Sequence, residues 1–383
     1  MTRKKKQRKK TGIFRGILLF INLVLVLALL VAYAAPFINP EKFLIPAFFG
    51  LAYPYLVLLN GAFVLIWMIA GKWYLLISLI LLLAGIPRHT PYIQPGHRCT
   101  IVSDSQGIKI ISFNTHNLTE NPLPNKSNPS KDAIYDFLDL ADAQLVCMQE
   151  FTTTGTDHLN EIKALGERME LPYHYLSNYY KSNPTKTNGL IIFSRFPVLN
   201  TGTLRDNRSK AFSIYTDILI HDADTVRIYN VHLESVYFHR KDYDFVKNIT
   251  TPGRMDQDIS KGSASIFKKL KDAYQKKVGQ VTLLREHMNL CPYPMILCGD
   301  FNVTPTSFTY RQLKKGMKDV FCECGRGFAS TFRNAILIPL RIDFILTDKS
   351  FSCCNYKTEK LSISDHYPVS VRVLIPGTDL SGK

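Results

Sequence analysis

Two long apolar stretches at the start of the chain constrain its fold most. No charged residue lies between Gly16 and Pro40, and a helix rising about 1.5 Å per residue over this run would cross the ~30 Å hydrocarbon core of a bilayer. Residues 43–87 hold one charge, that of Lys72, and are long enough for about two further crossings. We therefore expect this region to lie in a membrane.

The position of Lys72 predicts where the second stretch turns. A break near residue 60 would leave this charge at the centre of the last helix, at a cost of roughly 2.5–3.5 kcal/mol, whereas a break at Gly71 places it at the surface. We therefore expect three transmembrane helices within residues 13–88, the last of which, Trp73–Pro87, is short.

The first residues predict the orientation of this region. Residues 1–12 contain seven Lys or Arg and no acid, which is typical of a cytoplasmic tail. Three spans then place everything after Arg88 on the extracytoplasmic side of an integral membrane protein. A cleavable signal peptide is the alternative, because residues 32–35 resemble a cleavage site. The apolar run is longer than a usual signal core, and the next segment is hydrophobic too, so we expect the lipid bilayer to be a partner.

The net charge of the chain does not describe its C-terminal part. Residues 1–88 carry +10 of the formal +16, from 11 basic residues and one acid, whereas the other 295 residues hold 36 basic and 30 acidic side chains. The basic composition is therefore no indication of a nucleic-acid-binding domain.

Residues 108–376 have the pattern of an α/β domain, between a linker at 89–107 and a tail at 377–383. We expect helices at Lys131–Leu140 and Ser263–Met288. The expected strands are Ile108–Asn114, Leu145–Glu150, Leu190–Ser194, Phe212–Ile220, Val226–His232, Met295–Cys298, Asp343–Thr347 and Val369–Leu374.

Polar side chains stand at or just after the ends of these strands or on loops beside them. They are Asn114, Glu150, His232, Asp300, Asn302, Asp343, Asp365 and His366. A single acid in such a place is more often a turn former or a helix cap, but a rigid sheet can bring several together. Oxygen-rich ligands suit Mg²⁺, with Mn²⁺ as the alternative, and no spacing resembles a zinc site.

The ordered motifs NTHN, QE, GLIIFSRFPV, NVHL, GDFN, RIDFIL and SDHYPV resemble the endonuclease/exonuclease/phosphatase superfamily, metal-dependent phosphoesterases related to DNase I. The resemblance covers about residues 108–376. It implies a DNase I-like four-layer sandwich of two mixed β-sheets flanked by helices, with the site at one end of the sheets.

The resemblance also implies how a metal and a phosphate would be held. Glu150 resembles the principal metal-ligating glutamate, assisted by Asn114 and Asp365. Asn302 resembles a residue that contacts the phosphate, and we expect Arg341 to add a second phosphate contact.

The remaining polar residues resemble the catalytic groups of that family. Asp300 and Asn302 resemble the pair that positions the attacking water. Asp343 and His366 resemble the carboxylate–imidazole pair, and His232 the second histidine of the DNase-like members. A divalent ion and a protonated histidine would neutralise the charge that develops on the phosphate.

These expectations combine into a membrane-anchored, divalent-metal-dependent phosphoesterase. It would hydrolyse a phosphodiester or phosphomonoester by in-line attack of a water that the metal and Asp300 activate. The substrate would be a lipid, another membrane-proximal phosphoester or a soluble metabolite. A membrane-bound nuclease is one alternative, and a non-catalytic membrane scaffold that only binds a ligand is another. No obligate protein partner is expected.

Cysteines form two clusters, Cys322 with Cys324 and Cys353 with Cys354. In an extracytoplasmic domain a disulfide could join the clusters, although the sequence does not predict the pairing. A metal site there is the weaker interpretation, because the spacings match no common zinc pattern.

Overall fold

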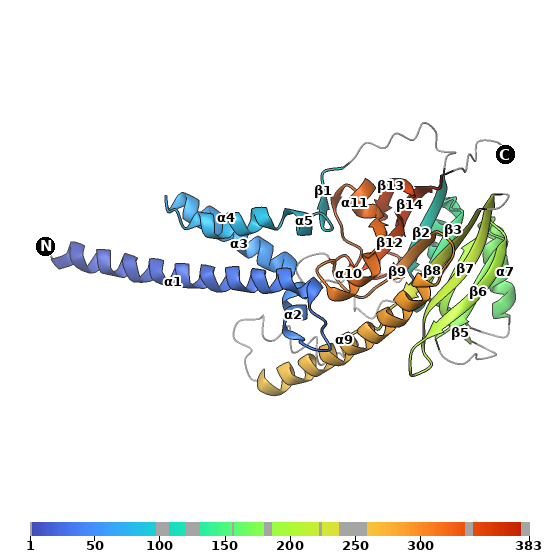
Figure 1. Ribbon diagram of the computed structural model, residues 1–383, viewed down its shortest axis with the longest axis horizontal. Helices are drawn as coiled ribbons and strands as arrows, with labels where there is room; N and C mark the ends of the chain where they lie inside the picture. The colour runs from blue at the N-terminus through green and yellow to red at the C-terminus, as the bar shows by residue number, and fades with distance from the viewer. Residues whose placement is uncertain are drawn as a thin grey trace. The chain divides into compact units, whose positions relative to one another are not determined.

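The computed structural model of the chain is shown in Figure 1. It describes residues 2–96, 107–118, 131–154, 157–179, 186–221, 224–236, 259–333 and 340–376, of which residues 2–11, 154, 186, 221, 259–261 and 263 by their backbone alone. The predicted tail at 377–383 and residues 97–106 of the predicted linker lie outside this description.

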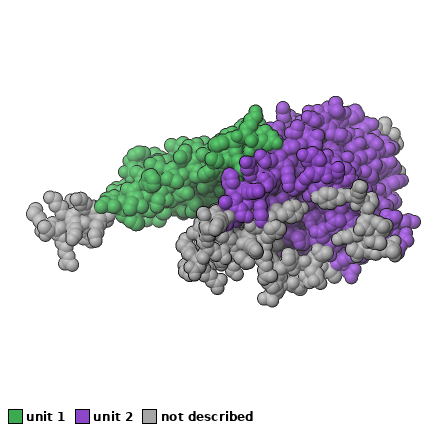
Figure 2. All heavy atoms as spheres, turned by 90° about the horizontal axis from the view of Figure 1, so that it is seen from below, with its two compact units in different colours: residues 1–92, 304–311 green, residues 93–303, 312–383 purple. Residues whose placement is uncertain are grey.

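The chain forms two compact units, which Figure 2 shows in different colours. The first comprises Met1–Tyr92 with Thr304–Arg311, and the second Ile93–Val303 with Gln312–Lys383. The helices of the N-terminal region are α1 (Thr2–Ala34), the 3₁₀ turn η1 (Ala35–Phe37), α2 (Ile45–Leu51), α3 (Tyr53–Ile69), α4 (Leu75–Ala84) and α5 (Ile86–His89).

The expectation of three transmembrane helices is wrong. Among the described residues one stretch, Gly12–Phe37, is by itself long and apolar enough to cross a membrane, with 26 residues and a mean hydropathy of 2.9. Helices α2 and α3 pass the same test only together, and they are bent by 68° to one another. Helix α4 has 10 residues, or about 15 Å, which is half of a bilayer core. By length and composition, the described helices thus include one that could cross a membrane, or two if the bent pair counts as one.

Prolines and a glycine divide the second apolar stretch into short helices. Pro46 and Pro54 lie in the first turns of α2 and α3, where a residue without an N–H group is tolerated but a preceding helix cannot continue. Gly71 adopts a left-handed φ of +61° between α3 and α4. The break at Gly71 was predicted, and the break before Pro54 was not.

Polar side chains lie inside the helical unit. Trp67 Nε1 donates to Asn22 Oδ1 (2.9 Å), Asn22 Nδ2 donates to Ser78 Oγ (2.6 Å), and Ser78 Oγ donates to Asn60 Oδ1 (2.9 Å). All four side chains are buried. The network therefore joins α1, α3 and α4 by side-chain hydrogen bonds.

Large apolar side chains of the same helices point outward. Phe20 is 68% exposed and Ile69 is 85% exposed, and only 22% of the most hydropathic window of Gly12–Phe37 is buried. A water-soluble helical domain has the opposite arrangement, with apolar residues inside. Polar contacts between helices with an apolar exterior are typical of packing in lipid.

Helices α3 and α4 form a hairpin beside α1. Tyr53, at the start of α3, is hydrogen-bonded through its hydroxyl to His89 Nδ1, after α4 (2.6 Å). Tyr33, near the end of α1, donates its hydroxyl proton to the Leu81 carbonyl (3.0 Å). The first residues of α3 and the last of α4 therefore lie level with the C-terminal end of α1.

The second unit contains two mixed six-stranded sheets. The order is β13-β14-β2-β3-β5-β4 in the first sheet and β10-β12-β9-β8-β7-β6 in the second. The strands are β2 (Ile108–Asn114), β3 (Leu145–Thr154), β4 (Tyr173–Asn178), β5 (Lys186–Ser194), β6 (Val198–Arg205), β7 (Ala211–His221), β8 (Asp224–His232), β9 (Met295–Asp300), β10 (Met317–Asp319), β12 (Asp343–Asp348), β13 (Ser352–Thr358) and β14 (Val369–Leu374). A separate pair joins β1 (Ile93–Gln94) to β11 (Gly327–Phe328).

Helices cover the outer faces of both sheets (Figure 1). Aliphatic side chains of the two sheets form one buried cluster between them. Helices α6 (Lys131–Leu140) and α7 (His158–Arg168) bury Ile134 and Leu165 against the first sheet. Helix α9 (Ile259–Asn289) places His287 Nδ1 2.8 Å from the Tyr229 hydroxyl of the second. The predicted α/β fold, with two mixed sheets flanked by helices, is confirmed.

Every predicted strand has a counterpart in the structure, and both predicted helices are present, the second slightly longer than expected. Further elements were not predicted: β4, β6, β10 and β13, the short turn η2 (His116–Leu118), and the helices α7, α10 (Phe308–Lys314) and α11 (Val320–Cys324).

The two cysteine clusters lie next to each other between α11 and β13. Cys324 Sγ lies 2.7 Å from Cys353 Sγ, and both are thiols. Cys354 is disulfide-bonded and Cys322 is free.

Candidate active site

Two parallel strand pairs bring the candidate residues to one edge of the sandwich. Strands β2 and β3 are parallel in the first sheet and end at Asn114 and beyond Glu150. Strands β8 and β9 are parallel in the second, where His232 lies opposite Asp300. Strand β12 runs antiparallel to β9 and begins at Asp343, also opposite Asp300. Strand ends far apart in the sequence thus meet at one place.

A β-bulge turns Glu150 toward this place. The register of β3 shifts between Met148 and Phe151, and Glu150 has a left-handed φ of +52°. Its Oε2 accepts a hydrogen bond from Asn117 Nδ2 (2.8 Å), and its Oε1 one from Asn114 Nδ2 (3.5 Å). Two amide groups therefore hold the carboxylate.

Asp300 lies at the centre of the group. Its Oδ1 accepts from the Asn302 backbone N–H (2.8 Å), and its Oδ2 accepts from Asn114 Nδ2 (3.0 Å) and Asn302 Nδ2 (3.2 Å). Burial raises the pKa of Asp300 to about 7. Positive charge on His366 works against this increase, and the nearby Asp343 carboxylate adds to it. A carboxylate with such a pKa can take up a proton near neutral pH.

His366 is held by Asp343. Its Nδ1 lies 2.9 Å from Asp343 Oδ2, and its Nε2 lies 3.7 Å from Asp300 Oδ2. The Asp343 backbone N–H donates to Thr331 Oγ1 (3.0 Å), which fixes the start of β12. Burial opposes a charge on the imidazole, but the two carboxylates outweigh it and raise the pKa of His366 well above its usual range. His366 is therefore a cation at neutral pH.

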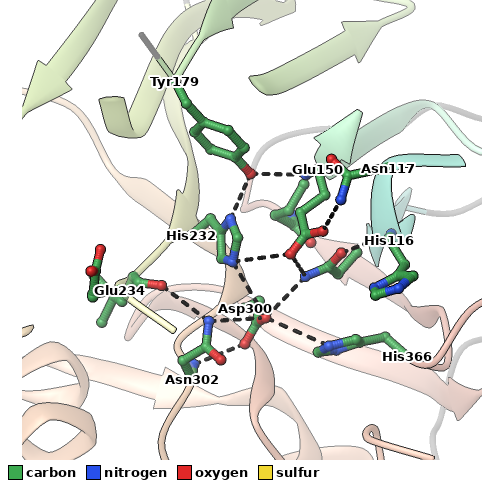
Figure 3. A network of polar contacts seen from close by, with 12 residues as sticks. His116, Asn117, Glu150, Tyr179, His232, Glu234, Asp300, Asn302 and His366 are labelled. Atoms are coloured by element: carbon green, nitrogen blue, oxygen red, sulfur yellow. Dashed lines mark hydrogen bonds and ion pairs between the residues drawn. The ribbon is translucent and has the colours of Figure 1, made fainter. Parts of the chain in front are cut away.

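His232 is neutral, unlike His366. Burial and the charge of Lys210 lower its pKa to about 3. Its Nδ1 lies 2.5 Å from the Tyr179 hydroxyl. Its Nε2 has no hydrogen-bond partner among the described residues and lies 3.6 Å from Glu150 Oε1 and 3.8 Å from Asp300 Oδ2 (Figure 3). A buried nitrogen without a partner is costly, so this atom suits a group that enters the site from outside.

The carboxylates fit a divalent cation. Burial raises the pKa of Glu150, which means that its charge is incompletely compensated by the protein. Asp365 Oδ2 lies 3.2 Å from His116 Nδ1. Asp300, Asp343 and His366 bring one possible ligand atom each within 4.8 Å of one another, but the cationic His366 is a poor ligand. The oxygen donors best suited to Mg²⁺ are then Glu150, Asp365 and Asn114, and their roles as ligands stay a prediction.

Four residues of this network were not singled out from the sequence. His116 and Asn117 belong to the NTHN segment, whose histidine and second asparagine are the signal that could have indicated them. Asn188 donates from Nδ2 to Asn117 Oδ1 (2.5 Å) and so supports the amide that holds Glu150. Tyr179 had no such signal, because only the folded chain brings it to the site.

Arg341 lies in an environment that argues against the predicted phosphate contact. Its side chain is fully buried, and Nη1 and Nη2 both donate to the Asp319 carboxylate (2.8 and 2.5 Å). Its guanidinium also lies over the rings of Phe321 and Phe344. The sequence shows that Arg341 lies shortly before β12. It does not show that the Arg341 guanidinium forms an ion pair with the Asp319 carboxylate.

A cluster of buried charges supports the loop after β9. Lys277, on α9, donates from Nζ to the Asn302 carbonyl (2.7 Å), and burial lowers its pKa to about 8. Glu234, just after β8, accepts from Arg208 Nη2 (2.9 Å) and Lys210 Nζ (3.2 Å). These contacts hold the chain on both sides of the site.

A family model described as "Endonuclease/Exonuclease/phosphatase family" matches residues 111–366, two thirds of the chain and the whole of the site described above. The chain belongs to the endonuclease/exonuclease/phosphatase family. A second model, a domain of unknown function (DUF8431), matches residues 15–92, which lie in the helical unit. A search of the curated proteins finds no match.

Solved structures of this family resemble the chain in fold. An endonuclease/exonuclease/phosphatase from Beutenbergia cavernae is 14% identical with a TM-score of 0.50, over 71% of this chain and 72% of that one. A family protein from Bacteroides thetaiotaomicron is 17% identical with a TM-score of 0.49, over 71% and 96%. A mannosyl-6-phosphatase from the same organism is 18% identical with a TM-score of 0.46, over 70% and 100%. At 14% identity, the likeness to the Beutenbergia cavernae structure concerns the fold alone.

Proposed function

We propose that the chain is a membrane-anchored, divalent-metal-dependent phosphoesterase. The observation that carries this proposal is the buried group of Asp300, Asp343 and His366, which faces the unpartnered Nε2 of His232 across one small space. A structural role would not require a carboxylate with a raised pKa beside a cationic imidazole and a donor without a partner.

A metal would be held by Glu150, Asp365 and Asn114. Bound there, Mg²⁺ or Mn²⁺ supplies Lewis-acid stabilisation of the charge that develops on the phosphoryl oxygens. Glu150 is already oriented for this by the amides of Asn114 and Asn117.

The protein's own groups would provide the proton transfers. Asp300 accepts a proton from the attacking water, whose oxygen forms the new bond to phosphorus as the bond to the leaving oxygen breaks. Asn114 and Asn302 hold the Asp300 carboxylate in place for this step. The cationic His366 is available to give the leaving oxygen its proton, and neutral His232 donates a hydrogen bond from Nε2 to a phosphoryl oxygen.

The helical unit would anchor the enzyme. Its polar side chains lie inside and its large apolar side chains outside, which fits a lipid environment. The α3–α4 hairpin returns to the level of Tyr33, so the chain after α4 leaves on the side where α1 ends. Because the basic residues lie at the N-terminal end of α1, we infer a cytoplasmic N-terminus and an extracytoplasmic catalytic unit. The disulfide at Cys354 supports an oxidising compartment.

The substrate would be a phospholipid or another phosphoester at the membrane. Anchorage raises the effective concentration of such a substrate without any new contact. The formal charge of +6 after residue 88 gives little support to strong binding of duplex nucleic acid, which requires several phosphate contacts.

Turnover by the full chain in liposomes tests this proposal. Bis-p-nitrophenyl phosphate should be hydrolysed with Mg²⁺ and not after chelation, and Asp300→Asn should abolish turnover, whereas Asp348→Asn at the far end of β12 should not. Hydrolysis of a labelled phospholipid should be much faster when it shares the enzyme's vesicle than when it is in separate vesicles. Equal rates in both arrangements would contradict a lipid substrate, and cleavage of plasmid DNA alone would favour a nuclease.

A further inference from the structure

One hydroxyl group touches both sides of the site without belonging to any predicted motif. Tyr179 follows β4 and is 6% exposed. Its hydroxyl oxygen accepts the backbone N–H of Glu150 (2.9 Å) and lies 2.5 Å from His232 Nδ1. Figure 3 shows the ring reaching from the chain just after β4 to a point between these two residues.

The contact with Glu150 follows from the bulge in β3. At the bulge the ladder to β5 is interrupted between Met148 and Phe151, so the Glu150 N–H is not taken up by that ladder. A buried N–H requires another acceptor, and the Tyr179 hydroxyl supplies it. This bond holds the backbone in the left-handed conformation (φ +52°) that aims the carboxylate.

The contact with His232 selects one tautomer. One acceptor position of the Tyr179 oxygen is taken by the Glu150 N–H, and the single hydroxyl proton lies within hydrogen-bond reach of His232 Nδ1. An imidazole that accepts this hydrogen bond at Nδ1 carries its own proton at Nε2. That nitrogen faces the Glu150 and Asp300 carboxylates and lacks a partner among the described residues.

The backbone of Tyr179 is itself firmly held. Its N–H donates to the Asn188 carbonyl (2.9 Å), and its carbonyl accepts from the Ala211 N–H (2.7 Å) and from Arg205 Nη1 (3.1 Å). These bonds join β5, β7 and β6, which belong to both sheets. The hydroxyl can therefore serve as a fixed reference point for side chains of either sheet.

We propose that Tyr179 is a positioning residue of the active site. Through one hydroxyl it fixes the backbone of Glu150, from the first sheet, and the tautomer of His232, from the second. The inference rests on the proposed phosphoesterase function. It goes further by giving Tyr179 a role: this residue would contact neither metal nor phosphate, but it would align Glu150 on the metal-binding side with His232 on the phosphate-binding side.

Tyr179→Phe removes the hydroxyl and keeps the ring. The matched control is Tyr175→Phe on β4, whose hydroxyl bonds to Thr203 Oγ1 (2.9 Å) away from the site. Both variants are prepared as full chains in liposomes. With metal alone, Mn²⁺ binding followed by electron paramagnetic resonance should weaken about tenfold in Tyr179→Phe, and kcat should fall by about tenfold to a hundredfold with little change in KM. Tyr175→Phe should match the wild type in both.

The tautomer is tested in the wild-type protein, whatever the stability of the variant. Solid-state ¹⁵N spectra of histidine-labelled protein should show His232 with an unprotonated Nδ1 and a protonated Nε2, the signal being assigned by its loss in His232→Asn. A protonated Nδ1, or unchanged Mn²⁺ binding and kcat in a folded Tyr179→Phe variant, would overturn the proposal. If the wild type neither binds Mn²⁺ nor hydrolyses a phosphodiester, the proposed function fails instead.

Discussion

His366 Nδ1 lies 2.9 Å from Asp343 Oδ2, and both side chains are buried at the edge where the two sheets meet. The carboxylate keeps the imidazole cationic and directs its Nε2 toward Asp300 (3.7 Å). Two residues 23 positions apart thus form one hydrogen-bonded pair, and a comparison of single and double variants tests whether they act together.

Replacement of either partner should lower turnover strongly. We expect His366→Ala and Asp343→Asn each to reduce kcat by about 10²- to 10⁴-fold, because proton transfer to the leaving oxygen is lost or misdirected. The double variant should be hardly worse than either single variant, since each breaks the same unit. Losses that multiply in steady-state assays would instead show separate roles.

Glu150→Gln tests the metal site by removing one charge at constant volume. Activity should fall most at low Mg²⁺ and recover in part at high Mg²⁺, because the amide is a weaker ligand. Isothermal titration with Mn²⁺ should show the weaker binding directly. Glu167→Gln on the exposed face of α7 is the control. An unchanged metal titration for Glu150→Gln would remove this residue from the site.

The charges around Glu234 predict a pH dependence of stability. Burial alone would raise the pKa of this carboxyl, but Arg208, Lys210 and Lys276 lower it to about 2. The carboxylate therefore stabilises the fold above its unfolded pKa of about 4.3, and this contribution is lost as the pH falls toward 2. Glu234→Gln should cost on the order of 2 kcal/mol at pH 7 and about half of that at pH 3. Thermal melts at the two pH values measure the difference, and a pH-independent cost would mean a packing role only.

The buried network of the helical unit predicts a defined cost. Asn22→Ala removes the acceptor of Trp67 Nε1 and the donor to Ser78 Oγ, and we expect a loss of about 1–2 kcal/mol, seen as a lower melting temperature in detergent. The control is Leu23→Ala. Leu23 is the next residue along α1 and is 46% exposed, so this substitution should change stability little. Equal effects of the two substitutions would mean that hydrogen bonding does not hold these helices together.

A reporter fusion tests the orientation. Alkaline phosphatase folds only outside the cytoplasm, so fusion after Tyr92 should be active and fusion after Gly12 inactive. An active fusion after Gly12 and an inactive one after Tyr92 would place the catalytic unit in the cytoplasm. That result would contradict the inference that the hairpin between Tyr53 and His89 returns the chain to the side where α1 ends.

The sequence predicted the central strands because they are buried and apolar. Strands such as β2 and β9 are continuous runs of buried residues, whereas β4 and β6 lie at sheet edges, are partly exposed and show weaker patterns. The length of the apolar helices was overestimated because hydropathy does not show that α2 ends before Pro54, which lies in the first turn of α3. A run of apolar residues predicts that a segment lies away from water. The length of each helix depends on single residues such as proline, which lacks a backbone N–H.

The candidate site was predictable where its residues sit in short local motifs. GDFN and SDHYPV place Asp300 and His366 directly, but no local pattern shows that Asp319 takes up the charge of Arg341 or that Tyr179 reaches Glu150. These contacts depend on side chains meeting across the fold, which spacing along the chain does not encode. Whether a histidine is charged is likewise set by neighbours, as the contrast between His232 and His366 shows.

The hydrogen bond between Asn114 and Asp300 joins residues 186 positions apart, and that between Ser364 and the Asn114 carbonyl joins residues 250 apart. Contacts of such sequence separation form late, because the entropy of closing long loops must be overcome before they bring any gain. A chain that has made its helices and hairpins still lacks this edge of the sandwich. Recovery of turnover after dilution from denaturant should therefore lag behind recovery of secondary structure. The return of activity would then report the rate of the last step of folding.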